Sequence, residues 1–460
     1  MKRYIYKGLM LITVLAHSAC RKYVEISPEQ IRVLKRTSDF QQLLYNSTTF
    51  DPAYYLPVLA ADDTGNEILS WQNSLSLSQA NAFIWAEKTY GQSEEDVDWN
   101  NLYKQIYTCN LIEEGIMNSE GGTEALKELV LASARVHRAF AYYTLVNLYA
   151  KQYDPLSAES DPGVPLQLST SFYSSLERAS VQKVYEKISE DLKASLTGLP
   201  DKPDYSPNPS KAAAYSILSR VYLNMRQFAQ AEEYADRTLG IQNTLVDLND
   251  YAANRNTYPA KIRNPEVIFF KRTSQFPTSL AISSSATALY DQVNDLRYTT
   301  FYLSDPNIPG GNFPAGNGNK LYYKSRITAD GVWVGPTVPE LMLIKAECRA
   351  RADDPSGAVS ILNALRKKRY LRVNYSADLS ADSRAEALQH VINERGRELV
   401  GTGMRWFDQR RLSKDAGLVS PVTRLFKGES YTLEPESNRY TFAIADKYIQ
   451  LNPEIIQNPR

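Results

Sequence analysis

The stretch that decides the fold is ERGRELVGTGMRWFDQRR, which spans residues 394–411. Its acids and bases follow helical spacing, with Glu394 one turn before Arg397 and Arg405 one turn before Asp408. This spacing favours ion pairs along a helix, and bidentate arginine–carboxylate contacts packed against Trp406 would fix the segment on a scaffold. A catalytic or ligand-binding role is the alternative, but the block itself contains no His or Cys to serve as a nucleophile partner. We therefore interpret the block as structural.

Helical periodicity extends outward from this block over most of the chain. Apolar residues at i, i+3 and i+4 predict three long helices, over Trp99–Met117, Thr123–Tyr149 and Val181–Leu199. Two helix pairs with small residues at their crossing points are predicted over Ala212–Asn224 with Ala229–Leu239 and over Pro339–Ala352 with Gly357–Tyr370. These pairs resemble degenerate tetratricopeptide repeats, and generic antiparallel hairpins are the alternative. The chain is predicted to be mainly α-helical.

Between the two helix pairs, residues 241–336 form an irregular segment rich in Asn, Ser, Thr, Gly and Tyr. One strand is predicted in it, at Val267–Phe270. Pro306–Asn319 carries no charge and reads as loop. A segment of this length without regular structure is usually functional or disordered, and its aromatic content favours function.

Composition excludes several classes of protein. The 460 residues carry 52 Lys plus Arg and 52 Asp plus Glu, so the basic excess of a nucleic-acid binder is missing. Three Cys and three His leave little material for thiol or metal chemistry. Motifs for a nucleophile elbow, a phosphate loop or a dinucleotide fold do not occur, so we predict no enzyme, cofactor or metal site. The pair Asp62-Asp63, which could suggest a glycosidase, is interpreted as solvated loop charge.

The N-terminus is predicted to be a targeting segment. Residues 1–19 combine a basic start with a short apolar run, which is typical of a signal peptide. Cys20 follows small residues as in a bacterial lipobox, so we expect it to be acylated, although an ordinary signal peptide with a coincidental Cys is the alternative. Residues 20–29 would form an extended tether.

Several motifs in order resemble the SusD/RagB family of Bacteroidetes outer-membrane lipoproteins. The resemblance rests on five stretches of sequence: the helix from Trp99 through Asn110, Arg138-Ala139-Phe140 with the tyrosines that follow it, the turn Gly163-Val164-Pro165-Leu166, the block at 394–411 and Gln457-Asn458-Pro459. The resemblance implies a SusD-like fold, with tetratricopeptide-like helix pairs in a right-handed superhelical base and a loop-rich ligand face. It divides the chain into an N-terminal part at 30–240, the insert at 241–336 and a C-terminal part at 337–460.

The resemblance also implies a function. Members bind a glycan or a peptide above a TonB-dependent outer-membrane transporter (SusC-like), so the chain is expected to be lipid-anchored at the outer membrane and to face the exterior. An oligosaccharide is the expected ligand. An oligopeptide is the alternative ligand. The alternative function is that of a helical-repeat scaffold that binds another protein.

Sugar rings stack on exposed aromatic faces, while amides and charges bind their hydroxyls. Two loop regions offer such groups, and local loop packing is the alternative for each aromatic. The predicted ligand-binding residues are Trp71, Asn73, Trp85 and Tyr90 in the first region, and Tyr302, Tyr322 and Trp333 in the second.

Overall fold

The computed structural model describes residues 34–65, 67–171, 173–203, 208–275, 280–304, 320–373 and 375–460. Cys20, the predicted signal peptide and the tether lie outside the described residues. Within the described ranges, no helix is both long enough and apolar enough to cross a membrane.

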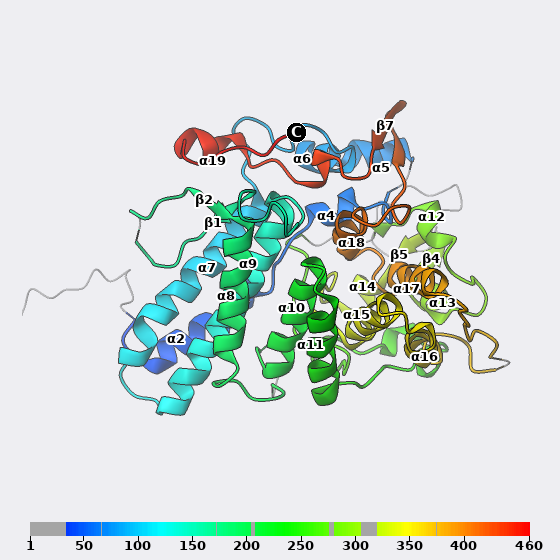
Figure 1. Cartoon of the computed structure of the whole chain (residues 1–460), viewed down its shortest axis with the longest axis horizontal. Coiled ribbons are helices and arrows are strands. Elements are labelled where there is room, and N and C mark those ends of the chain that lie inside the picture. The colour runs from blue at the N-terminus through cyan, green and yellow to red at the C-terminus, as the bar shows by residue number, and fades with distance from the viewer. Residues whose placement is uncertain are drawn as a thin grey trace, which may run out of the picture.

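The body of the protein is a curved row of helices, in which each helix packs on its neighbour in the chain (Figure 1). The row consists of α7 (Val97–Gly115), α8 (Glu124–Tyr149), α9 (Val181–Ser195), α10 (Lys211–Asn224), α11 (Phe228–Ile241), α15 (Val338–Arg351), α16 (Pro355–Arg366) and α17 (Arg384–Glu398). The expected helix pairs are α10–α11 and α15–α16, and α11 packs on α15 to join them. The mainly helical fold with repeated helix pairs is therefore confirmed.

Small residues allow these helices to approach closely. Ala213 on α10, Ala231 and Ala235 on α11 and Ala346 on α15 are all fully buried. The longest helix of the row is α8, with 26 residues. Thr123 caps it by accepting a hydrogen bond from the amide of Leu126. The row thus forms from local helix signals that the sequence carries.

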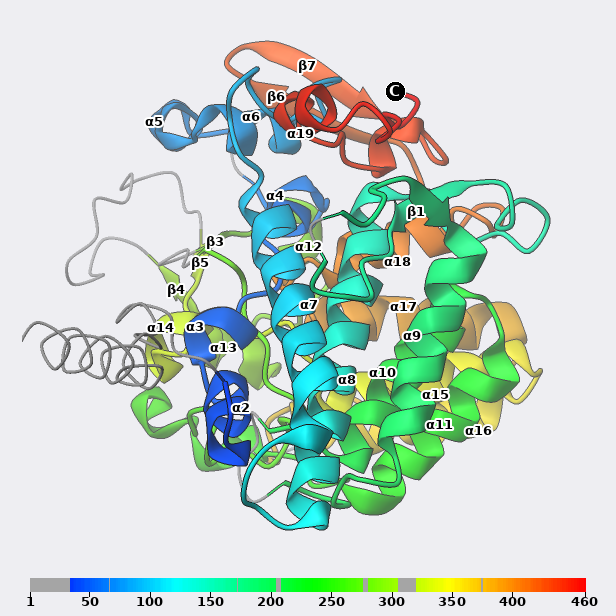
Figure 2. The ribbon, with the colours of Figure 1, turned by 90° about the vertical axis from the view of Figure 1, so that its left-hand side faces the viewer.

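A second layer lies along one side of the row, above the ends of its helices in Figure 1, and is built from N-terminal and C-terminal segments of the described chain (Figures 1 and 2). Its elements are α4 (Leu56–Ala60), α5 (Leu69–Ser74), α6 (Leu77–Phe83), α18 (Met404–Leu412), β6 (Val422–Phe426), β7 (Glu429–Leu433), η4 (Asn438–Tyr440) and α19 (Asp446–Leu451). Asn458 fastens the C-terminal segment to the end of α8, because its amide donates to the carbonyls of Tyr149 and Phe442.

The remaining short elements flank the row. They are α2 (Thr37–Leu44), α3 (Ser47–Phe50), η1 (Ile116–Asn118), the pair β1 (Pro162–Pro165) and β2 (Arg178–Ser180), and, within the insert, η2 (Leu248–Asp250), η3 (Arg255–Thr257), β3 (Leu280–Ala281), α12 (Ser284–Thr287), α13 (Leu296–Phe301), β4 (Tyr302–Ser304), β5 (Lys320–Tyr322) and α14 (Lys324–Thr328). In the insert, β5 lies between β3 and β4 in an antiparallel sheet. The prediction of a strand at Val267–Phe270 is wrong. Only Val267 of that stretch forms an isolated bridge, with Thr337, so no ladder develops.

The block at 394–411 is an interior ion-pair network that joins α15, α17 and α18. Glu347 accepts two hydrogen bonds from Arg411, at 2.6 and 2.7 Å, and Asp408 pairs with both Arg395 and Arg411. Trp406 is fully buried beside the network. These contacts agree with the structural interpretation of the block.

Candidate functional site

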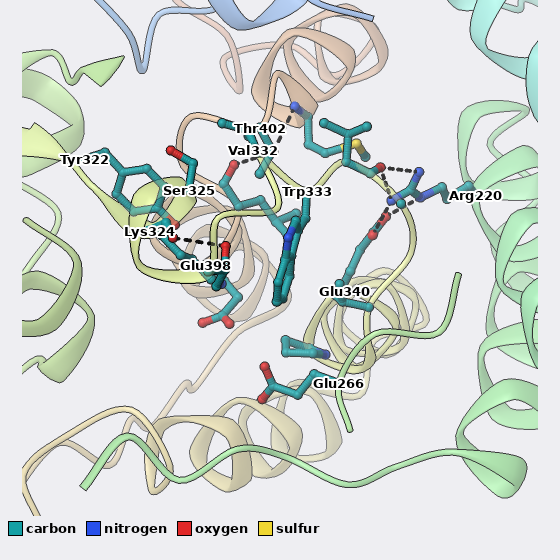
Figure 3. A pocket seen from close by; sticks show the side chains of 18 residues that line it. Arg220, Glu266, Tyr322, Lys324, Ser325, Val332, Trp333, Glu340, Glu398 and Thr402 are labelled. Carbon is teal, nitrogen blue, oxygen red and sulfur yellow. Dashed lines mark hydrogen bonds and ion pairs between the residues drawn. The ribbon is translucent and has the colours of Figure 1, made fainter. Parts of the chain in front are cut away.

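A small internal pocket brings together two residues of the predicted ligand site, Tyr322 and Trp333 (Figure 3). We call it the Trp333 pocket. Lys324 stands in it over the rings of Tyr258, Phe301 and Trp333, with Nζ 5.0 to 5.4 Å from the ring centroids. The pocket holds only about 50 Å³. That volume admits a few water molecules and excludes a sugar ring.

A much larger cleft of about 860 Å³ lies in the second layer. We call it the hairpin cleft, because the first strand of the β6–β7 hairpin forms one wall through residues 420–425. A second wall is formed by residues that precede α5, namely Asp62, Thr64, Gly65, Glu67 and Ile68. Residues 282–285 of the insert form a third wall, and Arg405 of α18 also lines the cleft. Its volume falls within the range of about 300–1,000 Å³ that is usual for small-molecule sites.

The arginines of the hairpin cleft are already engaged by the protein. Arg405 binds Asp62 through two hydrogen bonds, from Nε at 2.7 Å and from Nη2 at 2.9 Å. Arg424 is buried and donates to the carbonyls that end α4 and α6, among them those of Leu59 and Phe83. Burial lowers the pKa of Arg424 to about 9. Both cations therefore hold the cleft walls together.

The acids of the cleft region differ from one another. Asp63 is buried, so its interpretation as solvated loop charge is wrong. Burial, followed by the neighbouring Asp62, raises the pKa of Asp63 to about 7, and the amide of Gly401 donates to its Oδ2 at 2.9 Å. Glu67, in contrast, lines the cleft with an exposed side chain. The wall thus presents one solvated carboxylate.

Comparison with known proteins places this architecture in a family. The family described as "Starch-binding associating with outer membrane" matches residues 22–223, and the one described as "SusD family" matches residues 339–460. The chain belongs to the SusD/RagB family. SusD-like protein P38 of Formosa agariphila is 21% identical over 428 residues, which are 80% of each chain.

Solved SusD structures share the fold over nearly the whole chain. A SusD superfamily protein of Bacteroides thetaiotaomicron superposes with a TM-score of 0.75 at 20% identity, over 92% of this chain and 100% of that one. A structure named as a laminarin-binding SusD-like protein gives a TM-score of 0.62 at 17% identity, over 92% and 99% of the two chains.

Of the predicted ligand residues of this SusD/RagB protein, Trp71 and Asn73 lie on α5, which begins directly after the cleft-lining residue Ile68. Trp71 is half-buried and packs edge-to-face on Phe83, a residue of the cleft wall, with ring centroids 5.2 Å apart. Asn73 is exposed. These two residues stay predictions as ligand contacts.

The other predicted aromatics are less accessible than expected. The expectation of exposed rings is wrong for four of them, Trp85, Tyr90, Tyr302 and Tyr322, which are at most 7% exposed. Trp85 donates its indole N–H to the carbonyl of Ala60 at 2.9 Å, and Arg424 stacks on its ring. Tyr302 packs against Tyr298 and Tyr322 in an aromatic cluster of the insert. Trp333 is half-buried in its pocket.

The hairpin wall of the cleft was not predicted from the sequence, although it carries a recognisable signal. Residues 422–426 and 429–433 flank the dipeptide Lys427-Gly428, and β6 pairs with β7 so that Phe426 faces Glu429. Both turn residues have positive φ, 51° and 88°, as a two-residue type I′ turn requires. The β-branched and aromatic residues on either side of a Gly-containing dipeptide would have predicted this hairpin.

Proposed function

We propose that this SusD/RagB protein binds an uncharged oligosaccharide in the hairpin cleft and delivers it to a TonB-dependent outer-membrane transporter. The observation that carries the proposal is the size of the cleft, about 860 Å³, combined with a polar lining of Ser, Thr and charged residues beside the half-buried Trp71. Hydroxyl-rich ligands need such hydrogen-bonding groups, and an accessible indole offers a face for a sugar ring. The family description and the laminarin-binding neighbour support a glycan.

The charges of the cleft favour a neutral glycan over an anionic one. Arg405 and Arg424 are committed to Asp62 and to backbone carbonyls, whereas Glu67 faces solvent. No other Lys or Arg is among the described residues that line the cleft, so a uronate or sulfate group would meet the Glu67 carboxylate without a free cation of the lining to offset it.

The same proposal includes the location and organisation of the chain. Residues 1–19 would be removed as a signal peptide, Cys20 would carry the lipid anchor, and residues 20–29 would tether the body at 30–460 to the outer membrane. The body would bind ligand on the side of the insert and the hairpin, and it would have no catalytic role. The anchor would place it at the cell exterior, above the SusC-like transporter.

Isothermal titration of residues 21–460 tests the proposal with laminarin as the neutral probe, alginate as the anionic probe and a mixed oligopeptide pool. We expect binding of a neutral glycan and none of alginate. Trp71→Ala is expected to weaken the glycan at least tenfold, because truncation of a contacting aromatic commonly costs more than about 1 kcal/mol. Tyr173→Ala, which removes a fully exposed ring elsewhere, is the matched control and should bind normally.

Laminarin is one of several neutral glycans, so a wider array of neutral glycans follows if it does not bind. Binding of peptides alone would favour the oligopeptide alternative. Preferred binding of alginate would contradict the charge argument, and unchanged glycan affinity in Trp71→Ala would exclude this indole from the site.

A further inference from the structure

A separate pocket of about 250 Å³ lies at the other side of α18 from the hairpin cleft. We call it the Arg410 pocket. Its walls are residues 151–161 after α8, residues 410–414 at the end of α18, and residues 436–441 around η4. Arg405 and Arg410 are five positions apart on α18, which turns their side chains about 140° away from each other. The two cavities are therefore distinct.

Arg410 is a buried cation without a matching anion among the described residues. Its side chain is 2% exposed, yet it makes a single hydrogen bond, from Nη2 to the carbonyl of Ala150, and its Nη1 has no partner in the described structure. Burial lowers the pKa of Arg410 to about 10, and the opposing effects of Tyr185 and Tyr143 are smaller. A buried guanidinium without an anion lowers the stability of the folded protein by several kcal/mol, because its charge is desolvated and not offset.

The other buried arginines in the described part of the chain are all better satisfied. Arg424 donates to several backbone carbonyls. The rest pair with carboxylates: Arg138, Arg220, Arg297, Arg351, Arg366, Arg369, Arg395 and Arg411. Among the buried arginines of the described residues, Arg410 thus has neither a paired carboxylate nor more than one carbonyl acceptor.

The charged residues around Arg410 leave room for an anion. Lys151 neutralises Asp161 at 3.3 Å, and Lys414 neutralises Asp154 at 3.2 Å, so these acids are not directed at the guanidinium. Glu436 is exposed at the rim, where water screens its charge. Hydroxyl residues also line the pocket. Ser157, Ser413 and Thr441 already donate to Asp161, to the carbonyl of Arg410 and to the carbonyl of Ala150. Ser437 also lines the pocket.

We propose that the Arg410 pocket binds a small oxyanion, either free phosphate or sulfate or the carboxylate of a small organic acid. Nη2 of the guanidinium is committed to the carbonyl of Ala150, and Nη1 is the nitrogen left to donate to an oxygen of such an anion. Charge-assisted hydrogen bonds of this kind are among the strongest in proteins. The volume accommodates one such group together with several waters. This site is independent of the glycan proposed for the hairpin cleft.

The test is isothermal titration of residues 21–460 with sodium phosphate, sodium sulfate and sodium glucuronate, each at constant ionic strength set with NaCl. We expect saturable binding of at least one probe with a stoichiometry of one, and the preferred probe identifies the source of the oxyanion. Arg410→Met should weaken that binding at least tenfold. Arg237→Met, which removes an exposed arginine from α11, is the matched control and should leave it unchanged.

Lys414→Glu serves as a second variant, because its side chain is one-third exposed and the fold does not rest on it. If Arg410→Met fails to fold, Lys414→Glu is expected to weaken the oxyanion through repulsion at the rim, and unchanged affinity would then overturn the proposal. Absence of saturable binding for all three probes, or equal affinity in wild type and folded Arg410→Met, would also overturn it. Neutral-glycan binding in the hairpin cleft should be the same in wild type and Lys414→Glu, which keeps the two proposals separable.

Discussion

Replacing Lys271 by Met should stabilise the protein at neutral pH and should flatten the pH dependence of its stability. Lys271 is completely buried among the rings of Phe50, Phe140 and Phe269. Its Nζ donates to the carbonyl of Phe50 and lies 3.1 Å from Nδ1 of His137, and no carboxylate of the described chain forms an ion pair with it. Burial therefore lowers its pKa from 10.5 to about 7.

The direction of the effect follows from proton linkage. Between pH 7 and pH 10 the unfolded chain keeps the Lys271 proton while the folded chain releases it, so this residue makes the free energy of unfolding rise with pH. The rise is about 1.4 kcal/mol per pH unit at most, with an upper bound of roughly 5 kcal/mol over the whole window. Met fills a similar volume without the charge.

Urea unfolding of wild type and Lys271→Met, followed by circular dichroism at pH 7, 8 and 9, measures the effect. The variant should be more stable at pH 7, and its advantage should shrink by about 2–3 kcal/mol by pH 9. Lys261→Met is the matched control, since Lys261 pairs with the carboxylate of Asp51 at 3.1 Å. Parallel curves for wild type and Lys271→Met would refute the reasoning.

Two further substitutions probe the interior cations and anions. Glu347→Gln removes the charge that accepts two of the hydrogen bonds of Arg411, and breaking a buried pair of this kind should cost about 3–5 kcal/mol in urea unfolding. A loss below about 1 kcal/mol would mean that water replaces the carboxylate. Arg424→Met removes the donors that hold the ends of α4 and α6 to β6, so we expect a loss of about 3 kcal/mol or more and weaker glycan binding in the hairpin cleft. Arg424→Lys cannot reach the same carbonyls and should restore little of either, and full rescue by Lys would contradict the proposed clamp.

Helices were predictable from this sequence because their signals are local. The predicted Thr123–Tyr149 and Ala212–Asn224 differ from α8 and α10 by a single residue at one end. Caps, apolar spacing and small crossing residues act within a few turns, so one chain is enough to read them. The strand predicted at Val267–Phe270 failed because apolar β-branched residues there fill the core, and a strand also needs a partner that the sequence does not reveal.

Ion pairs were also predictable only where both partners lie within one turn of the same helix. Spacing correctly indicated the contact between Glu394 and Arg397, which measures 3.0 Å. It also suggested Arg405 with Asp408, whereas Arg405 binds Asp62, more than 300 positions earlier in the chain. Asp408 instead pairs with Arg395 and Arg411. A helix can offer a partner one turn away, but the tertiary fold offered Arg405 a bidentate carboxylate, and bidentate geometry is the stronger interaction.

Tyrosine explains why the aromatic ligand site was the hardest part to predict. The 31 tyrosines suggested half-wet surfaces, because the ring is apolar and its tip is polar. The fold uses several of them differently. Tyr142 buries its ring and donates to the carbonyl of Gln167, which lies in an irregular segment, and the half-buried Tyr103 donates to the carbonyl of Pro165 at the end of β1. Loops packed on helices leave such carbonyls without a strand partner, and a buried hydroxyl satisfies them. A tyrosine in a loop-rich sequence can thus donate to a backbone carbonyl from the interior as readily as it can bind a sugar on the surface. Only the tertiary structure tells which of the two roles a given tyrosine has.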